Sequence, residues 1–184
     1  MISIDAKEIE KAKILLENYP QQVKAAAASA INRTSAMVKT EVSKTIRKNY
    51  LISAKDIKST LSIKRASRSK LTGMISSIGQ APLITAFRVR AYKKGPVRVQ
   101  VMKKNKSKPV TGLFIGVSSK GYVGAMQRKN LNMRYPLRIP HGPSVPQMFS
   151  ADRSMSVIAP FAEKTLNQRF LHEISYRYGK FGGR

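Results

Sequence analysis

The stretch FRVRAYKKGPVRVQVM, residues 87–102, decides how the middle of this chain folds. Apolar and polar side chains alternate on both sides of the turn sequence Lys93-Lys94-Gly95-Pro96. A period of two is typical of β-strands, so the stretch predicts a β-hairpin with one apolar face and one largely basic face. Cations that face one another across a hairpin repel, and an anionic partner would remove that cost. The residues predicted to contact DNA or an acidic protein are Arg88, Arg90, Lys93, Lys94, Arg98, Lys103 and Lys104.

An excess of positive charge extends far beyond the hairpin. The 95 residues 57–151 contain 19 Lys or Arg and no Asp or Glu, in a chain of 184 residues with a formal net charge of +26. The lysine tract at residues 103–108 is expected to form an exposed loop. Self-repulsion on this scale destabilises a compact state, which points to a polyanionic partner. Two partners fit this charge, namely nucleic-acid phosphate and the acidic surface of another protein.

Helical periodicity flanks this β region on both sides. A long helix is predicted from Pro20, and an amphipathic helix from about Asp152, because apolar residues recur there at spacings of three and four. Pro160 is expected to kink the second of these helices or to begin a new one. Shorter helices are predicted at residues 5–19, capped by Asp5, and at residues 54–61, capped by Ser53. The apolar stripes consist of Val23, Ala27, Ala30, Ile31, Met37, Val38, Val42 and Ile46 in the first long helix and of Met155, Ile158, Ala162, Leu166, Phe170 and Ile174 in the last.

These elements predict an α+β fold, with N-terminal helices, a central, mainly antiparallel basic β-sheet and a C-terminal amphipathic helix. The sequence contains no internal repeat and no clean domain boundary, so a single domain is predicted over residues 1–184. Its expected parts are a helical N-terminal part (1–60), a basic β part (61–140) and a Pro-rich segment with the C-terminal helix (141–184). Besides the hairpin, strands are predicted at residues 61–66, 71–78, 113–117 and 122–127.

The composition argues against catalysis and against a bound cofactor. The chain has no cysteine, and its two histidines, His141 and His172, cannot supply a two-histidine metal site. His141 lies near Ser144 in the sequence, but no acidic residue lies within ten positions of it, so no catalytic triad is predicted. The acid-free middle also lacks the carboxylates of a metal-dependent nuclease. We therefore predict no enzyme activity, no catalytic residue, no metal site and no cofactor.

Missing patterns argue against two further classes of protein. No apolar run reaches the roughly 20 residues that span a bilayer, so no membrane contact is expected. The sequence also lacks helix-turn-helix, zinc-finger and RNA-binding sheet motifs, so any contact with DNA would be independent of base sequence. A free, sequence-independent nucleic-acid-binding basic protein is therefore one alternative function.

Two short motifs resemble a known family. Arg134-Tyr135-Pro136-Leu137, followed by GPSVPQMF at residues 142–149, resembles the carboxy-terminal signature of the minor tail protein Z family of long-tailed phages and prophages. Ala30-Ile31-Asn32-Arg33, inside an Ala-rich helix, fits the same family. The resemblance implies a structural virion protein of the tail or neck that acts in tail completion and head-tail joining, assembled in the bacterial host cytoplasm. It also implies a homo-oligomeric ring, with a hexamer as one candidate, beside tail-terminator, tail-tube or head-closure proteins and near the path of the phage DNA.

The motif residues allow more than one interpretation. Residues 142–149 fit a docking segment that is stiffened by two prolines, but they equally fit a turn whose apolar side chains belong to the subunit's own core. Asn32 has a lower helix propensity than its neighbours, which indicates a specific hydrogen bond. Arg33 fits an interface or simple solvent exposure. The residues assigned to the family motifs and to an assembly interface are Asn32, Arg33, Arg134, Tyr135, Pro136, Gly142, Pro143, Val145, Pro146, Met148 and Phe149.

Overall fold

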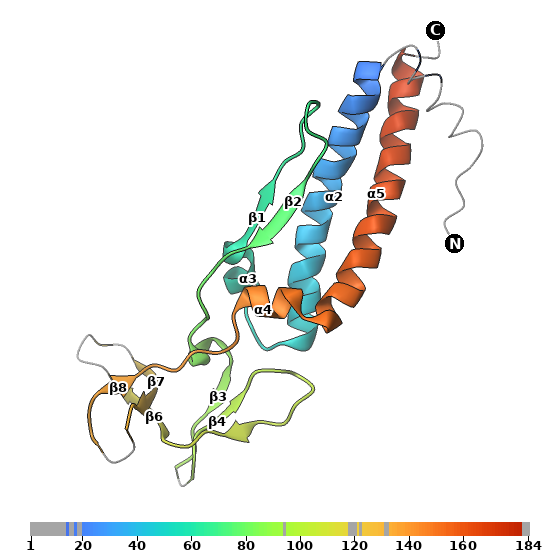
Figure 1. The fold of residues 1–184 in the computed structure, drawn as a ribbon. Helices are drawn as coiled ribbons and strands as arrows, with labels where there is room; N and C mark the ends of the chain where they lie inside the picture. The colour runs from blue at the N-terminus through green and yellow to red at the C-terminus, as the bar shows by residue number, and fades with distance from the viewer. Residues whose placement is uncertain are drawn as a thin grey trace. The chain divides into compact units, whose positions relative to one another are not determined.

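A computed structural model describes residues 14, 17, 20–93, 95–117, 121, 123–130 and 133–181. The fold is α+β, as predicted (Figure 1). The chain forms two compact units, the first from residues 1–42, 61–76 and 152–184, and the second from residues 43–60 and 77–151. The single domain inferred from the sequence stays a prediction. The helix predicted over residues 5–19 lies outside the described residues, except for Ile14 and Glu17, which are helical.

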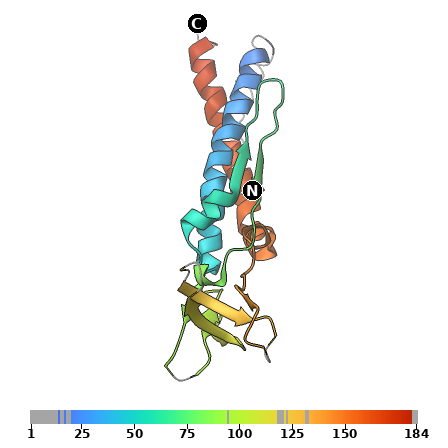
Figure 2. The same cartoon turned by 90° about the vertical axis from the view of Figure 1, so that its left-hand side faces the viewer.

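Two long helices and a small sheet build the first unit. Helix α2 spans Pro20–Asn49 and contributes its residues up to Val42 to this unit, and helix α5 spans Asp152–Phe181. Strands β1 (Leu61–Lys64) and β2 (Met74–Ser77) pair with each other. Figures 1 and 2 show α2 and α5 running antiparallel, with the two strands beside α2. The first unit is therefore a helical pair with a hairpin along one side.

Small side chains lie where α2 meets α5. Ala26 and Ala30 of α2 are fully buried, and Ala26 forms a cluster with the buried Ile174 of α5. Alanine is the best helix former and its short side chain lets neighbouring groups approach closely. The alanine-rich sequence of α2 thus favours both the helix and its packing. The partly buried side chains packed against this cluster are Val23, Phe170 and Tyr178.

The apolar stripe predicted for α2 is confirmed at most of its large residues. Val38, Val42 and Ile46 are buried. Met37 is 37% exposed, so the prediction was wrong for this residue. One helical position corresponds to a rotation of about 100°, which turns Met37 away from the face that carries Val38.

The predicted carboxy-terminal helix is present as α5, but its apolar stripe is buried only in part. Ile158 and Ile174 are buried, whereas Met155 and Leu166 are 39% and 36% exposed. Pro160, which we expected to kink the helix or to begin a new one, lies inside α5. Part of the apolar stripe of α5 is therefore exposed and is not covered by the rest of the first unit.

The second unit contains two small sheets of short antiparallel strands (Figure 2). One three-stranded sheet has the order β3-β4-β5 and the other has the order β6-β7-β8. The sequence predicted one central sheet, but with β1 and β2 the described residues form three small sheets. Several of the strands have only two or three residues. The strands are β3 (Arg88–Arg90), β4 (Arg98–Gln100), β5 (Lys108–Pro109), β6 (Leu113–Val117), β7 (Val123–Arg128) and β8 (Leu137–Arg138).

Short helices complete the second unit. They are α3 (Ala54–Thr60), the 3-10 helix η1 (Ile84–Ala86) and α4 (Val145–Ser150). The predicted cap of the first is confirmed, because the backbone N–H of Asp56 donates to Ser53 Oγ at 3.1 Å. The buried apolar side chains of this unit are Ile46, Tyr50, Ile52, Ile57, Ile84, Phe87, Val97, Val99, Leu113, Ala125, Met126, Val145 and Met148.

Candidate interface for an anionic partner

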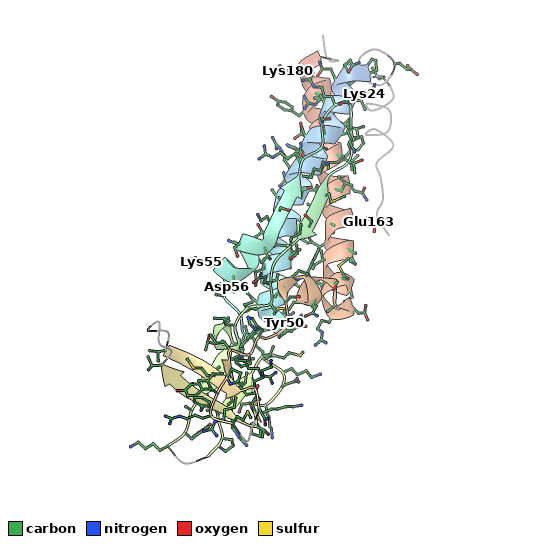
Figure 3. All side chains as sticks on the ribbon, turned by 60° about the vertical axis from the view of Figure 1, so that its left-hand side comes forward. Lys24, Tyr50, Lys55, Asp56, Glu163 and Lys180 are labelled. Carbon is green, nitrogen blue, oxygen red and sulfur yellow. The ribbon has the colours of Figure 1, made fainter. Side chains whose placement is uncertain are left out.

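The positive charge of the chain is concentrated in the second unit. The residues of this unit include 19 Lys or Arg and one acidic residue, Asp56, which is a net charge of +18 out of +26. That single carboxylate accepts a hydrogen bond from Ser53 Oγ at 2.7 Å. Figure 3 shows nitrogen-tipped side chains projecting around the strands of the unit. Carboxylates within this unit therefore neutralise very little of its positive charge.

Three arginines share one face of the β3-β4-β5 sheet. Arg90 lies directly opposite Arg98, and Arg88 lies opposite Gln100. Residues paired across antiparallel strands project on the same side, so the three guanidinium groups belong to one surface, which we call the arginine face. All three arginines are exposed, and none forms an ion pair with a described carboxylate. The alternation of the hairpin is confirmed, since Val89 pairs with Val99 on the other side.

The lysine tract that follows β4 is held by backbone contacts. The N–H of Lys103 donates to Asn49 O at 2.9 Å, at the end of α2. The side-chain amide of Gln100 donates to Asn105 O at 2.7 Å and to Lys103 O at 3.3 Å. The backbone is thus anchored while Lys103 and Lys104 stay exposed, as predicted for a surface loop. Of the two lysines in the hairpin turn, Lys93 is exposed and Lys94 lies outside the described residues.

A pocket of about 450 Å³ lies on the apolar side of the same sheet. The alternation in residues 87–102 predicted an apolar face but not a pocket. Its walls come from segments that are distant in the sequence, so no local pattern marks it. The lining residues are Tyr50, Ile84, Val99, Val101, Met102, Asn105, Lys106, Lys108, Val110 and Pro143.

Asn32 makes the specific hydrogen bonds that its place in a helix indicated. Its Nδ2 donates to Ala66 O at 2.9 Å, and its Oδ1 accepts from Ala66 N at 2.8 Å. Ala66 follows β1, so the amide of Asn32 ties this loop to α2. This contact lies within the first unit, and a role of Asn32 in assembly stays a prediction.

Arg33 binds a buried carboxylate of α5. Its Nε lies 3.2 Å from Glu173 Oε1, although the Arg33 side chain is 59% exposed and that of Glu173 only 5%. Arg177 Nη2 lies 3.5 Å from the other carboxylate oxygen and donates to Ser29 Oγ at 3.1 Å. Solvent exposure alone therefore does not describe Arg33. The spacing of Glu173 and Arg177, one helical turn apart, could have been recognised in the sequence, but the contact of Glu173 with Arg33 on another helix could not.

The segment at residues 142–149 is shaped by contacts within the chain. Ser144 caps α4, with its Oγ accepting from Gln147 N at 3.4 Å and its N–H donating to Gln147 Oε1 at 2.9 Å. Pro146 stands in the first turn, where a proline is tolerated. Val145 and Met148 are buried at 1% and 0% exposure, as expected if they belong to the subunit's own core. The spacing Ser-x-x-Gln is a capping-box pattern that could have been recognised in the sequence.

Gly142 is required by the packing of a distant aromatic ring. A Cβ atom at Gly142 would overlap the ring of Phe87, which is buried. The Gly142 N–H donates to Pro82 O at 2.9 Å, and Ile84 N donates to Pro140 O at 2.9 Å. This part of the motif therefore holds two chain segments together. The remaining motif residues Pro143 and Phe149 are half-buried.

The motif residues Arg134, Tyr135 and Pro136 lie on the surface. Tyr135 is 64% exposed, and Arg134 Cζ lies 5.8 Å from the centre of its ring. The peptide bond between Tyr135 and Pro136 is cis, and Pro136 O accepts from Lys129 N at 3.0 Å. These three side chains are exposed, as is that of the motif residue Arg33, and so are accessible to a partner. Their role in assembly stays a prediction.

Comparison with known proteins places the chain in one family. Within the described residues, no three His, Asp or Glu side chains are grouped so that they could hold a metal ion, and no helix is long and apolar enough to cross a membrane. No curated protein and no solved structure matches the chain. The model of the prophage minor tail protein Z (GPZ) family matches residues 7–178, nearly the whole sequence. The chain is therefore a member of the minor tail protein Z family, a family of structural phage tail proteins.

Proposed function

We propose that this phage tail protein is a ring-forming, non-enzymatic subunit of the neck or upper tail. It acts in tail completion and head-tail joining, beside tail-terminator, tail-tube or head-closure proteins. The observation that carries the proposal is the net charge of +18 on the second unit. A subunit of this charge needs anionic neighbours, and a tail assembly supplies them as acidic ring proteins, as DNA, or as both.

The arginine face is the surface assigned to this contact. Arg90 and Arg98 lie directly opposite each other, where like charges destabilise a strand pair. An anion placed between them would turn repulsion into two charge-assisted hydrogen bonds. The stronger the repulsion between these arginines in the free protein, the more an anionic partner would stabilise the arginine face.

Ring formation increases the repulsion between copies. Each copy adds a formal charge of +26, so a ring of this chain alone would bring many cations together. We expect the isolated protein to be monomeric or to aggregate at low salt and to enter a ring only beside its partners. A stable closed ring of the lone protein at low salt, seen by sedimentation velocity, would count against the proposal.

Duplex DNA binding across a salt series tests which anion the arginine face takes. Two results are compatible with the proposal, and each identifies a different anionic partner. Binding with a steep salt slope that the triple variant Arg88→Glu/Arg90→Glu/Arg98→Glu flattens assigns the face to DNA, with a slope of about −0.9 per phosphate neutralised. Negligible binding at physiological salt assigns the face to acidic proteins, which is then tested with the purified neighbouring ring proteins.

A matched control separates the arginine face from net charge. The triple variant Arg65→Glu/Arg68→Glu/Lys70→Glu changes the charge by the same amount at exposed positions of the first unit. Heparin serves as a polyanionic competitor. If both triple variants weaken DNA binding and partner binding equally, the arginine face has no special role.

Tail completion itself is tested in a phage that lacks its own copy of this gene. The wild-type chain should restore infectious particles, and the arginine-face variant should leave tails that fail to join heads. Electron microscopy of the lysate distinguishes unjoined tails from absent tails. Full complementation by the arginine-face variant would contradict the proposed role of that face.

A further inference from the structure

The apolar side of the β3-β4-β5 sheet offers a second binding surface, distinct from the arginine face. Val99 lines the pocket of about 450 Å³ there, and Lys108 is the direct cross-strand partner of Val99. Cross-strand partners project on the same side of a sheet. Lys108 therefore stands beside the pocket on the side opposite to Arg88, Arg90 and Arg98.

The pocket combines an apolar floor with a basic rim. Ile84, Val99, Val101, Met102 and Val110 supply aliphatic or thioether surface. The two lysines of the lining, Lys106 and Lys108, are exposed, and neither pairs with a described carboxylate. The volume falls in the range of about 300–1,000 Å³ that is typical of ligand pockets. All lining residues belong to the second unit.

We propose that this pocket binds the apolar anchor side chains of an acidic segment of another tail protein. Lys106 and Lys108 would pair with carboxylates on either side of the anchors. Charge complementarity favours this occupant, because the second unit has a net charge of +18, which attracts an acidic segment and repels a basic one. The inference depends on the proposed function in one respect, namely that the acidic segment belongs to another protein of the phage tail.

Two other occupants fit the pocket less well. Nucleic acid without base readout binds through phosphates and through bases stacked on accessible aromatic rings. Tyr50 is the aromatic residue among the described lining residues, and it is only 7% exposed, so this lining offers no accessible ring on which a base could stack. A second copy of this unit would bring a further charge of +18 against the same rim.

The test uses the purified full-length chain and two labelled peptides. One peptide repeats Asp-Glu-Leu, and the other has glycine in place of every leucine and so has the same charge. Binding is measured by fluorescence anisotropy at about 150 mM salt, because salt at this concentration screens long-range electrostatic attraction. We expect the leucine peptide to bind at least about tenfold more tightly, since burial of one leucine side chain corresponds to that ratio or more.

Two variants locate the binding site. Val101→Trp places an indole ring in the pocket and should reduce the preference for the leucine peptide, with circular dichroism checking that the fold is kept. Lys106→Glu/Lys108→Glu should weaken leucine-peptide binding at least about tenfold more than Arg88→Glu/Arg90→Glu, a matched reversal on the opposite face. The second comparison stays informative even if the tryptophan variant does not fold.

Several results would overturn the assignment. Equal affinity for the two peptides would leave charge alone as the cause of binding, and equal effects of the two double reversals would place binding elsewhere. Single-stranded DNA that competes only when the pocket is unfilled would assign it to nucleic acid, and altered self-association of Val101→Trp would assign it to a second copy. Peptide binding is measured on the isolated chain, so its failure is distinguishable from a failure of tail completion in the phage.

Discussion

Arg33 Nε lies 3.2 Å from Oε1 of Glu173, whose side chain is 95% buried. This ion pair joins the middle of α2 to α5. Arg177 approaches the other carboxylate oxygen, and its own Nε is buried without a hydrogen-bond partner in the described part of the chain. Buried charges are tolerated when they are paired. The two arginines and Glu173 therefore form a charge cluster in which the carboxylate is the shared member.

Removal of the Glu173 charge should destabilise the first unit. Glu173→Gln leaves Arg177 largely buried without its anion, and we expect a loss of about 2–4 kcal/mol in the free energy of unfolding. Glu163→Gln, at an exposed position of the same helix (Figure 3), should change it by less than about 0.5 kcal/mol. Urea unfolding followed by circular dichroism measures both. Equal losses would mean that the buried cluster contributes nothing specific.

The amide of Asn32 should stabilise the loop after β1. Asn32→Ala removes two hydrogen bonds to Ala66, at 2.9 and 2.8 Å, and leaves that backbone unpaired. We expect a loss of about 1–3 kcal/mol, measured by urea unfolding, and faster amide exchange at Ala66. Asn32→Asp keeps the acceptor but not the donor, so its loss should come from Ala66 O alone while the Ala66 amide stays protected. Unchanged exchange at Ala66 in the alanine variant would contradict this role.

The buried hydroxyl of Thr34 should reduce the stability of the first unit. Its Oγ1 is buried and has no hydrogen-bond partner in the described part of the chain. Thr34→Val has the same shape without the unpaired polar group, and we expect a gain of about 1 kcal/mol in thermal or urea unfolding. The same exchange at Thr60, whose hydroxyl donates to Ile57 O at 2.8 Å, should have the opposite sign. A destabilised Thr34→Val variant would show that the hydroxyl has a partner after all.

Local patterns predicted the parts of this structure that depend on neighbours in the sequence. The hairpin of β3 and β4 could be recognised because alternation is a property of consecutive residues, and the Ser53 cap because its bond spans three positions. The hydrogen bond of Asn32 could be expected because asparagine is a poor choice for a helix interior. Its partner, Ala66, could not be identified from that observation.

Contacts between segments that are distant in the sequence could not be predicted from local patterns. In the sequence, Glu173 is an acidic residue on a predicted helix, and none of its sequence neighbours indicates that it contacts Arg33. Phe87 reads as a strand residue, although its ring requires glycine at position 142. The pocket has the same origin, since Tyr50 and Pro143 meet β4 only in the folded chain.

Gly142 should not tolerate a side chain. Gly142→Ala places a methyl group against the buried ring of Phe87, and we expect a loss of about 1–3 kcal/mol in the free energy of unfolding from overpacking. The second change Phe87→Leu should recover part of this loss, because it removes the ring that causes the overlap. Gly179→Ala is the control, since an added Cβ meets nothing there and alanine favours the helix. Additive losses in the double variant would contradict the steric explanation.

The arginine face should make the second unit sensitive to salt in the absence of a partner. Arg90 and Arg98 face each other across β3 and β4, so screening of their repulsion should stabilise the chain. We expect the melting temperature to rise by a few degrees between about 50 and 500 mM salt. Arg90→Thr keeps β propensity, removes the repulsion, and should reduce this rise while raising the melting temperature at low salt. Arg65→Thr, an exposed change of equal charge in the first unit, should leave more of the salt dependence intact. A salt dependence that is the same in both variants would mean that total charge, and not the pairing of these two arginines, governs the stability of the unit.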